Sequence, residues 1–448
     1  MTSKFHNKKI IIIGSGFRAM MTAFYCLKKS NDVTLLSKNE NIHGVMSPIK
    51  WLGGNFDKGY HFFDGFNIRN KKILEEFVDK ENLYDFGYGA ATYTNNKTYP
   101  DHGIPYWLHK SLLFSFNSFI QYLFLIFKKK NINIESYQDL LCTLPSNISK
   151  ILEKACLRNT NLNANELSSI VSRYSHFLCY RQTIFPDTIS NFLKKINFFN
   201  ERLASRRKSL NLDQISLYPK GKNMGFIACE MEKKLKELGL KIIISEKNQI
   251  SNSNNRLVVS SDKGSHNPDY IFIVTELDDA LKLFEEKISD KKNNHFVSQV
   301  LYYFATNTLH SKFQYIHGND INIYTNRATN ISLYGEKTNS NEFVISAEVP
   351  TKINSDVWRN SESFKEIIWN ELKMMNMVAK NQNFTNYKIF NVEKTLSVPL
   401  INFDNSLKTF HSLINSKYSN KILLPGVGTF TRNIFMNSLN SIFKNENK

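Results

Sequence analysis

The sequence predicts an α/β protein in which a parallel sheet with flanking helices is interrupted by a second, α+β region. Three observations lead to this prediction. A short apolar run near the N-terminus leads straight into a glycine-rich turn and a helix, a second apolar run follows that helix, and segments of the same kind return near the middle and the end of the 448-residue chain. A chain of this length can bury a large core and divide into two linked domains.

The first unit of the predicted sheet occupies residues 10–36. Residues 10–13 are four isoleucines, the pattern of a parallel strand that is buried on both faces. A helix is expected over residues 20–29, where apolar side chains recur on one face, and residues 32–36 (DVTLL) supply the next strand. Strand, glycine turn, helix and strand in this order are typical of a Rossmann-like domain that binds a dinucleotide. The turn consists of the candidate cofactor-binding residues Gly14, Ser15, Gly16, Phe17, Arg18 and Ala19.

The residue types of this turn suit a diphosphate. Gly14 permits the tight turn, Gly16 lets the backbone approach the phosphates, and the small Ala19 lets the helix pack close to the strand. The N-terminus of the helix then stabilises the anionic diphosphate through its N–H groups and its dipole, without a dedicated basic side chain.

Two residues after the second predicted strand bear on the ribose of the dinucleotide. A Glu or Asp commonly binds the ribose hydroxyls at this point, whereas this chain has Ser37 and Lys38. Ser37 can make one neutral hydrogen bond in place of charge-assisted bonds, at a loss of about 1–3 kcal/mol. A Ser-Lys pair also suits the 2′-phosphate of NADP, so both cofactors stay open at this point.

The next residues favour a flavin. A His-Gly pair at His43 and Gly44 follows the second strand, and residues 55–63 (NFDKGYHFF) come shortly after it. Together with the glycine turn, this order resembles the superfamily of FAD-dependent amine oxidases, protoporphyrinogen oxidases and UDP-galactopyranose mutases. The resemblance covers nearly the whole chain and implies FAD as the cofactor, with His43 in the place of a first glycine. It adds the cofactor-binding candidates Gly44, Asp57, Gly59, Tyr60 and His61.

Composition and charge exclude several classes of protein. The chain is 42% hydrophobic, which is neither a disorder signature nor a multispan membrane signature. Its net charge of +18 comes from scattered lysines and arginines, and no basic module with interleaved aromatic residues indicates nucleic acid as a partner. The five cysteines form no C-x-x-C pair, and no metal site is expected. Because the first strand starts by residue 10, we expect no cleavable signal peptide and a cytoplasmic protein.

The region that we expect to bind the substrate begins with a helix over residues 68–86 and a hairpin over residues 88–99. Residues 135–193 are expected to be helical. Within them, Asn163 and Glu166 offer a capping box for one helix.

Residues 111–127 (SLLFSFNSFIQYLFLIF) form the most apolar segment, and three lysines follow it. Its serines and its glutamine share one face of a helix. Such a helix rises roughly 26 Å, short of the ~30 Å hydrocarbon core, so we do not expect it to span a membrane. We favour a core or substrate-channel helix. The alternative is an in-plane helix anchored by the lysines, which would give peripheral contact with the inner face of the membrane through residues 111–130.

The dinucleotide-binding domain is expected to resume at residues 217–225 (LYPKGKNMG), a segment that resembles an element of the same superfamily and contains the candidate substrate-binding residue Tyr218. A helix that ends at Gly239 should follow. Further strands are predicted at residues 240–244, 256–260 and 270–274.

Three strands are predicted in the following substrate region, at residues 300–305, 321–324 and 343–349. The second leads to Arg327, which resembles a substrate-side arginine of the superfamily. An arginine at a strand end can clamp a phosphate or a carboxylate with two hydrogen bonds, and an exposed surface arginine is the equally weighted alternative.

The C-terminal residues 421–437 resemble the strand, glycine and helix that lie beneath the flavin in the superfamily, with Val427 and Asn437 in the places of charged residues. The matching cofactor-binding candidates are Gly426, Arg432 and Met436. The resemblance therefore implies a discontinuous FAD-binding domain at residues 1–66, 215–276 and 396–448, and an inserted α+β substrate domain at residues 67–214 and 277–395.

The function that we favour from the sequence is an FAD-dependent oxidoreductase, in which a small-molecule substrate passes a hydride to flavin N5. The first alternative is a flavin-dependent sugar-nucleotide isomerase that resembles UDP-galactopyranose mutase in surface-polysaccharide synthesis, because the basic charge and Arg327 would suit a phosphorylated substrate. The second is a binding protein of this fold without FAD, because Ser37, His43 and Val427 depart from the family pattern. The sequence identifies no catalytic residue.

Overall fold

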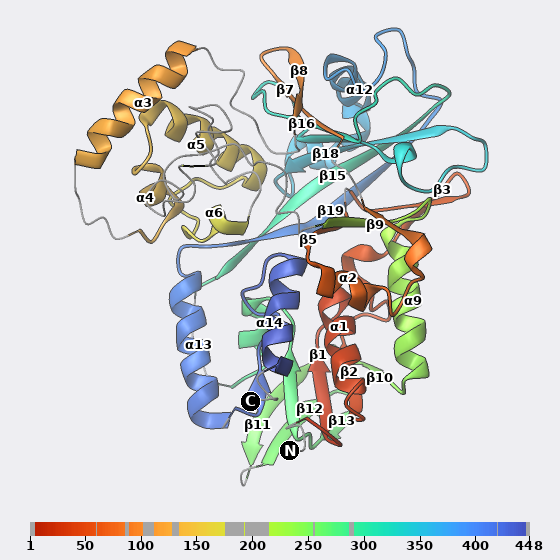
Figure 1. Ribbon diagram of the computed structural model, residues 1–448, viewed down its shortest axis with the longest axis vertical. Helices are drawn as coiled ribbons and strands as arrows, with labels where there is room; N and C mark the ends of the chain where they lie inside the picture. The colour runs from red at the N-terminus through yellow and green to blue at the C-terminus, as the bar shows by residue number, and fades with distance from the viewer. Residues whose placement is uncertain are drawn as a thin grey trace.

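The structure of the protein is a computed structural model that describes residues 5–59, 61–85, 89–101, 112–127, 134–174, 192, 215–253, 256–285, 291–418 and 420–444. A five-stranded parallel sheet with its helices forms the lower half of the molecule in Figure 1, and a larger, mainly antiparallel sheet crosses the upper half. A group of helices lies beside the larger sheet. The fold is α/β, as the sequence predicts.

The parallel sheet has the strand order β10-β2-β1-β14-β20. Its central strand β1 pairs with β2 on one side and with β14 on the other, so the sheet is built outward from β1 in both directions. The strands are β1 (Lys9–Ile13), β2 (Asp32–Ser37), β10 (Lys241–Ile244), β14 (Tyr270–Ile273) and β20 (Ile422–Leu423). The strands predicted at residues 10–13, 32–36, 240–244 and 270–274 are confirmed.

Helices cover both faces of this sheet because alternate residues of β1 point to opposite sides. Ile10 and Ile12 pack in one core with α1, α9 and α14, whereas Ile11 and Ile13 pack in another with α10 and α13. The helices are α1 (Gly16–Leu27), α9 (Met224–Glu237), α10 (Leu277–Leu281), α13 (Phe403–Tyr418) and α14 (Arg432–Lys444). The strand predicted at residues 256–260 forms outside the parallel sheet, in an antiparallel sheet of β11 (Asn248–Ser253), β12 (Arg256–Ser261) and β13 (Gly264–His266).

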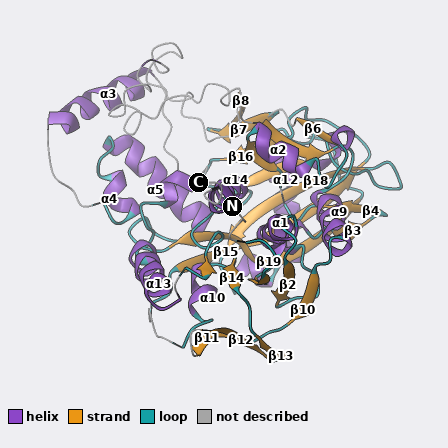
Figure 2. Ribbon diagram, turned by 60° about the horizontal axis from the view of Figure 1, so that its bottom comes forward, coloured by secondary structure: helices purple, strands orange, loops and turns teal. Residues whose placement is uncertain are grey.

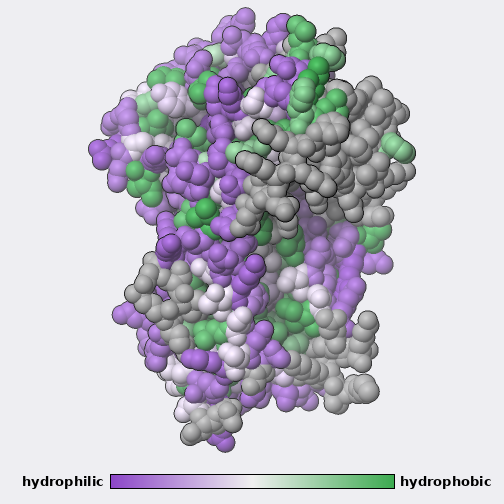
Figure 3. All heavy atoms as spheres, turned by 90° about the vertical axis from the view of Figure 1, so that its left-hand side faces the viewer, coloured by the Kyte–Doolittle hydropathy of each residue, from purple (hydrophilic) through white to green (hydrophobic). Residues whose placement is uncertain are grey.

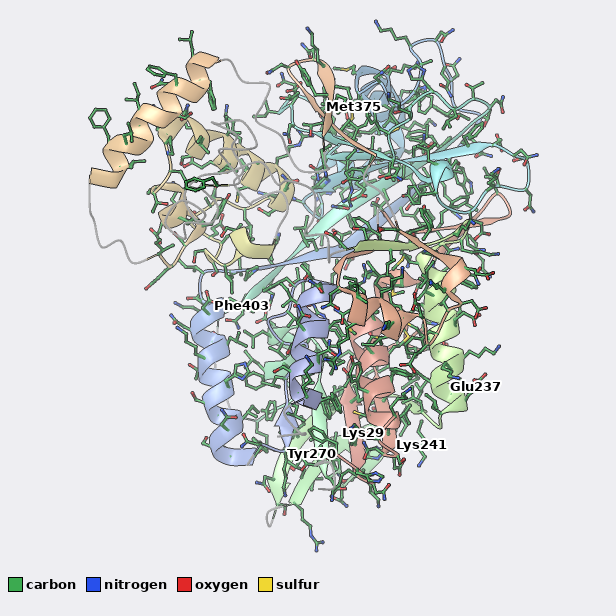
Figure 4. The ribbon with its side chains drawn as sticks, in the orientation of Figure 1. Lys29, Glu237, Lys241, Tyr270, Met375 and Phe403 are labelled. Carbon is green, nitrogen blue, oxygen red and sulfur yellow. The ribbon has the colours of Figure 1, made fainter. Side chains whose placement is uncertain are left out.

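The carboxyl ends of the parallel strands face the larger sheet. Lys241 and Tyr270, which begin β10 and β14, lie at the lower end of the molecule in Figure 4, together with Lys29 beyond the end of α1. The strands therefore run upward and end below the larger sheet. In open parallel sheets, ligands bind beyond the carboxyl ends of the strands, so this junction is where a site is expected.

The larger sheet has the strand order β19-β15-β18-β17-β16-β7-β8. Its long strands β15 and β19 run side by side through the middle of the molecule (Figure 2). Trp369 of helix α12 (Lys365–Met374) packs on this sheet against Phe304. The strands are β7 (Ala90–Thr94), β8 (Lys97–Asp101), β15 (Asn294–Thr306), β16 (Tyr315–Gly318), β17 (Arg327–Asn330), β18 (Phe343–Thr351) and β19 (Asn386–Pro399), and α11 (Asp356–Arg359) precedes α12. The predicted hairpin and the strands predicted at residues 300–305 and 343–349 are confirmed.

Two predictions for segments outside the parallel sheet are wrong. Residues 321–324 form no strand, and Arg327 begins β17 instead of ending a strand before it. The helix predicted over residues 68–86 stops early, as α2 (Ile68–Leu74), because the chain then forms β6 (Leu83–Asp85). That strand pairs with β9 (Ile215–Pro219), which also pairs with β5 (Phe63–Phe66). A short hairpin of β3 (Ile49–Trp51) and β4 (Gly54–Phe56) completes the described strands.

The helices beside the larger sheet are α3 (Leu112–Phe127), α4 (Tyr137–Leu141), α5 (Ser146–Thr160) and α6 (Val171–Tyr174). The predicted capping box is present in part, because Glu166 accepts the backbone N–H of Asn163 at 2.8 Å. The predicted helix does not start there, because Leu167 pairs as an isolated bridge with Leu400. Much of the rest of the segment predicted as helical lies outside the described residues. Among the helices that the structure describes, none has the length and apolar character to cross a membrane.

Candidate functional site

A cleft of about 1760 Å³ lies between the carboxyl ends of the parallel strands and the long strands of the larger sheet. This volume exceeds the roughly 300–1,000 Å³ of common small-molecule sites, so the cleft has room for a dinucleotide and a substrate. Residues at or just beyond the ends of four parallel strands line it, and they include Gly14, Lys38, Glu246 and Val274.

The glycine turn after β1 forms one wall of the cleft. Gly14 and Gly16 have φ values of +141° and +76°, which favour glycine. A Cβ atom on Gly14 would lie 2.7 Å from Val274 Cγ2, so no side chain fits between the ends of β1 and β14. A Cβ atom on Gly16 would meet nothing closer than 3.8 Å, so this position needs glycine for its backbone conformation and not for lack of space.

The N-terminus of α1 opens into the cleft. Ser15 caps the helix with extended backbone but makes no side-chain capping bond, and no acidic residue lies in the first turn. The first N–H groups of a helix have no acceptor within the helix. The Gly16 N–H donates to the carbonyl of Ile42, so the N–H groups after it and the positive end of the dipole can bind an anion. The helix start is anchored by buried Phe17, whose ring centre lies 5.3 Å from that of Phe63, and by fully buried Ala19.

Arg18 joins three segments at the cleft. Its Nη1 donates to Glu276 Oε1 at 3.0 Å and to the carbonyl of Gly426 at 3.2 Å, and its Nη2 donates to the carbonyl of Thr429. Gly426 packs so tightly that a Cβ atom would lie 2.5 Å from Val274 Cα. The Arg18 side chain therefore fixes the loops after β14 and β20 against the start of α1.

The two residues after β2 differ in their access to the cleft. Ser37 is fully buried, and its hydroxyl donates to the carbonyl of Asn39 at 2.8 Å and accepts the N–H of the same residue at 3.2 Å. This hydroxyl is engaged within its own turn and is not part of the cleft lining. Lys38 does line the cleft, with Nζ 3.5 Å from Asp279 Oδ1. A bond from Ser37 to a ribose stays a prediction.

His43 and Gly44 differ in backbone conformation. His43 has a right-handed φ of −74°, so the histidine fits without strain, and its Nε2 lies 2.6 Å from Glu232 Oε2 on α9. Gly44 has φ +60°, and a Cβ atom there would lie 3.1 Å from Gly16 Cα. The Gly16 N–H donates to the carbonyl of Ile42 at 2.6 Å, which holds this loop against the glycine turn.

Asp57 is buried at the N-terminus of α9. It accepts the Met224 N–H at 2.8 Å and the hydroxyl of Tyr218 at 2.6 Å. Burial raises the pKa of Asp57 to about 7, although both hydrogen bonds and the charge of Arg432 act in the opposite direction. Burial and the nearby Asp57 also raise the pKa of the Tyr218 hydroxyl. Asp57 and Tyr218 thus form a buried pair outside the cleft lining.

Gly59 turns the chain from Asp57 toward the cleft with φ +85°. Its N–H donates to the hydroxyl of Tyr303 at 3.0 Å, and this hydroxyl donates to the carbonyl of Asp57 at 2.6 Å. Tyr303 of β15 therefore fixes the turn. Tyr60 lies outside the described residues.

His61 and Arg432 lie together at the end of the cleft nearest the larger sheet. Desolvation lowers the pKa of His61 to about 3, and the charges of Arg432 and Arg327 add to this shift, so the imidazole is neutral at physiological pH. Arg432 begins α14, donates to the carbonyl of Phe62 at 2.8 Å and lies 5.4 Å from the ring centre of Phe63. Burial lowers the pKa of Arg432 to about 10, which leaves the guanidinium charged.

Two further candidates lie outside the cleft lining, as do Ala19, Gly59 and Gly426. Met436 is fully buried in the core that also contains Phe17 and Phe435. Arg327 forms a bidentate ion pair with Glu348, directly opposite it on β18, at 2.9 Å from Nε and 2.6 Å from Nη2. Its side chain is 19% exposed and that of Glu348 is 5% exposed. The guanidinium is therefore already bound to a carboxylate within the protein.

Sequence reasoning missed Thr275. It lines the cleft, and its hydroxyl is buried without a hydrogen-bond partner among the described residues, so a ligand could satisfy it. The signal was available, because Thr275 directly follows a strand that the sequence predicts. The residues of the larger sheet that line the cleft follow no predicted strand end or motif, so the sequence did not indicate them. They are Phe296, Val392, Lys394, Thr395, Leu396 and Ser397. In the described part of the chain, no cluster of His, Cys, Asp or Glu could hold a metal ion.

Comparisons with known proteins find similar folds at low sequence identity. A reduced UDP-galactopyranose mutase superimposes with a TM-score of 0.73 at 13% identity, over 97% of this chain and 95% of the mutase. A protein described as a protoporphyrinogen oxidase, from Exiguobacterium sp. 255-15, gives 0.66 at 14% identity over 98% of both chains. A putrescine oxidase with bound putrescine gives 0.62 at 9% identity over 98% of both chains.

No protein-family model matches the sequence, and no curated protein does. At these identities the solved structures show a shared fold. The resemblance that the glycine turn and residues 55–63 indicate is therefore confirmed at the level of the fold.

Proposed function

We propose that the chain is an FAD-dependent oxidoreductase of the amine oxidase and protoporphyrinogen oxidase type. The observation that carries this proposal is the cleft, which extends from an uncapped helix N-terminus at the ends of β1 and β14 to residues of β15 and β19. The first part suits a dinucleotide, and the second has room for a substrate beside its reactive end.

The residues around the cleft fit FAD. The N-terminus of α1 would hold the diphosphate, and the unsatisfied hydroxyl of Thr275 would be satisfied there. The end of the cleft near Glu246 and Asp262 would take the adenosine half, and His61 and Arg432 would lie toward the flavin. Bound FAD supplies a two-electron acceptor for a hydride from a C–N or C–C bond of the substrate.

The chain's own residues contribute placement and electrostatics. Arg432 keeps a positive charge at this end of the cleft, which stabilises negative charge that develops beside it. His61 is neutral, so it can accept or donate a hydrogen bond without adding charge. Phe62, Phe296 and Leu396 add apolar surface to the cleft lining. The substrate is expected to be a small molecule, and a cytoplasmic location remains part of this proposal.

Anaerobic titration of the FAD-loaded protein with candidate amines and alkenes tests the proposal. We expect one class of substrate to bleach the flavin absorbance in the absence of oxygen, because the hydride has no other acceptor. If no candidate of either class bleaches the flavin, the oxidoreductase assignment loses its support.

The second candidate is a flavin-dependent sugar-nucleotide isomerase. The similarity to UDP-galactopyranose mutase over nearly the whole chain favours it, as do Lys58, Lys394 and Arg432 around the cleft. The argument for this candidate from Arg327 does not hold, because the Arg327 guanidinium is paired with Glu348 and is not free to clamp a diphosphate. Binding of UDP, with turnover that needs reduced flavin and consumes no oxidant, would select this candidate. Protein that binds neither FAD nor UDP would select the flavin-free binding protein.

A further inference from the structure

The side of helix α3 that faces the rest of the protein contains polar residues beside the partly buried Phe114. Ser118 is fully buried, and its Oγ accepts a hydrogen bond from Asn147 Nδ2 at 2.6 Å. Gln121 Oε1 accepts the backbone N–H and the hydroxyl of Ser146 at 2.9 and 3.0 Å. The narrow polar stripe of α3 is therefore bound to the start of α5, the reverse of an ordinary surface helix, whose apolar stripe faces the core.

The opposite side of α3 is apolar and exposed. Leu113 is 79% exposed, Phe116 is 63% exposed and Phe124 is 71% exposed. Ile120 and Leu123 lie on the same side and are also exposed, and the spacing of the five residues places them on one face of the helix. This exposure corrects the core or channel helix that we favoured from the sequence. Hydrophilic side chains cover much of the described surface on the side of the molecule seen in Figure 3.

The sequence around α3 indicates what covers this face. From residue 102 to residue 134 the chain has no Asp or Glu, and Lys110 and three consecutive lysines at residues 128–130 flank the helix. Tyr106 and Trp107 precede it, and such residues are common at the boundary between a membrane and water. Basic flanks without acidic residues complement the phosphates of anionic lipids, whereas a protein partner would need a matching acidic surface.

We propose that α3 lies in the headgroup plane of an anionic lipid bilayer, with its outer apolar face in the acyl boundary. The 16-residue helix rises about 24 Å, less than the ~30 Å hydrocarbon core, so it lies along the membrane and does not cross it. The attachment goes beyond the proposed function and does not depend on the cofactor.

Sedimentation of the full-length protein with vesicles tests this proposal. We expect binding to vesicles of phosphatidylcholine and phosphatidylglycerol, weaker binding to phosphatidylcholine alone, and weaker binding at high salt, which screens the lysines. The double variant Phe116→Ser/Phe124→Ser should reduce the partition coefficient by about tenfold or more. The control variant Ile321→Ser/Ile353→Ser removes two other exposed apolar side chains, 69% and 47% exposed, and should bind like the wild type.

The melting temperatures of both variants should equal that of the wild type, because all four side chains are exposed. The proposal is overturned if the wild type does not sediment with the anionic vesicles, or if the Phe116/Phe124 variant sediments as well as the wild type. It is also overturned if the wild type forms a dimer without lipid that this variant abolishes, because the face would then join two copies of the chain.

Discussion

The Arg327–Glu348 ion pair gives a prediction that separates a structural arginine from a substrate clamp. Replacing Arg327 with Ala leaves the 5% exposed carboxylate of Glu348 without its bidentate partner. A carboxylate that loses such a partner inside a protein keeps the cost of desolvation and loses the attraction that offset it. We therefore expect Arg327→Ala to destabilise the fold, whatever the substrate is.

The magnitude follows from the burial of the pair. Removing one partner of a buried ion pair typically costs about 3–5 kcal/mol. With an unfolding entropy of about 2.1 cal/mol/K per residue, a 448-residue chain that unfolds as one unit has about 0.9 kcal/mol/K, so the melting temperature should fall by roughly 3–5 °C.

Differential scanning calorimetry of a double-mutant cycle measures this effect. The double variant Arg327→Met/Glu348→Leu should recover most of the lost stability, because an apolar pair of similar volume can replace a buried ion pair. UDP binding should be unchanged by Arg327→Ala once the fold is intact. An Arg327→Ala variant that melts with the wild type but loses its affinity for UDP would refute this reasoning and restore Arg327 as a diphosphate clamp.

Two further predictions concern pH. The pKa of Asp57 is raised to about 7, so the folded state holds a proton that the unfolded state releases near pH 4, and the free energy of unfolding should fall as pH rises through this window. Asp57→Asn should remove that slope in urea denaturation at pH 5 and pH 7, and an unchanged slope would show that Asp57 is ionised in the fold. The pKa of His61 is lowered to about 3 in the folded state, so below pH 6.5 the unfolded state binds a proton that the folded state does not. The free energy of unfolding should therefore fall as pH falls from about 6.5 toward 3. His61→Asn should flatten the acid side of the profile, and a steeper acid side would contradict the neutral imidazole.

The sequence predicted the parallel sheet because its signals are local. Each signal spans only a few neighbouring residues: the isoleucines of β1, the apolar residues of β14 and the glycine turn. The pattern of these residues decides both that a strand forms and that it is buried. The early end of helix α2 depends instead on a distant partner, because the following strand β6 pairs with β9. The Asn163 N–H bond to Glu166 formed, but pairing of Leu167 with Leu400 prevailed over the helical pattern.

The site was predicted in part for the same reason. Gly14, Gly16 and Gly44 could be placed from the motif, since their backbone conformations are local. The bond from Ser37 to Asn39, the pair of Asp57 with Tyr218 and the outward apolar face of α3 could not, because each depends on which groups the folded chain brings together.

Binding of FAD tests the central claim most directly, and two glycine variants sharpen the test. Gly16→Ala imposes a side chain at φ +76° beside the proposed diphosphate site, and Gly221→Ala imposes one at φ +61° with no atom within 4 Å of its Cβ and outside the cleft lining. Both should cost about 1–2 kcal/mol of stability, because L-residues disfavour this conformation.

The deciding measurement is the shift of the melting temperature on adding FAD to the wild type and to both variants, with the flavin absorbance of the repurified protein. A ligand at a hundred times its Kd stabilises the folded state by about 2.7 kcal/mol. The account predicts that the wild type and Gly221→Ala are stabilised by FAD and stay yellow, whereas Gly16→Ala folds but responds weakly. A colourless wild-type protein whose melting temperature does not respond to FAD would contradict it.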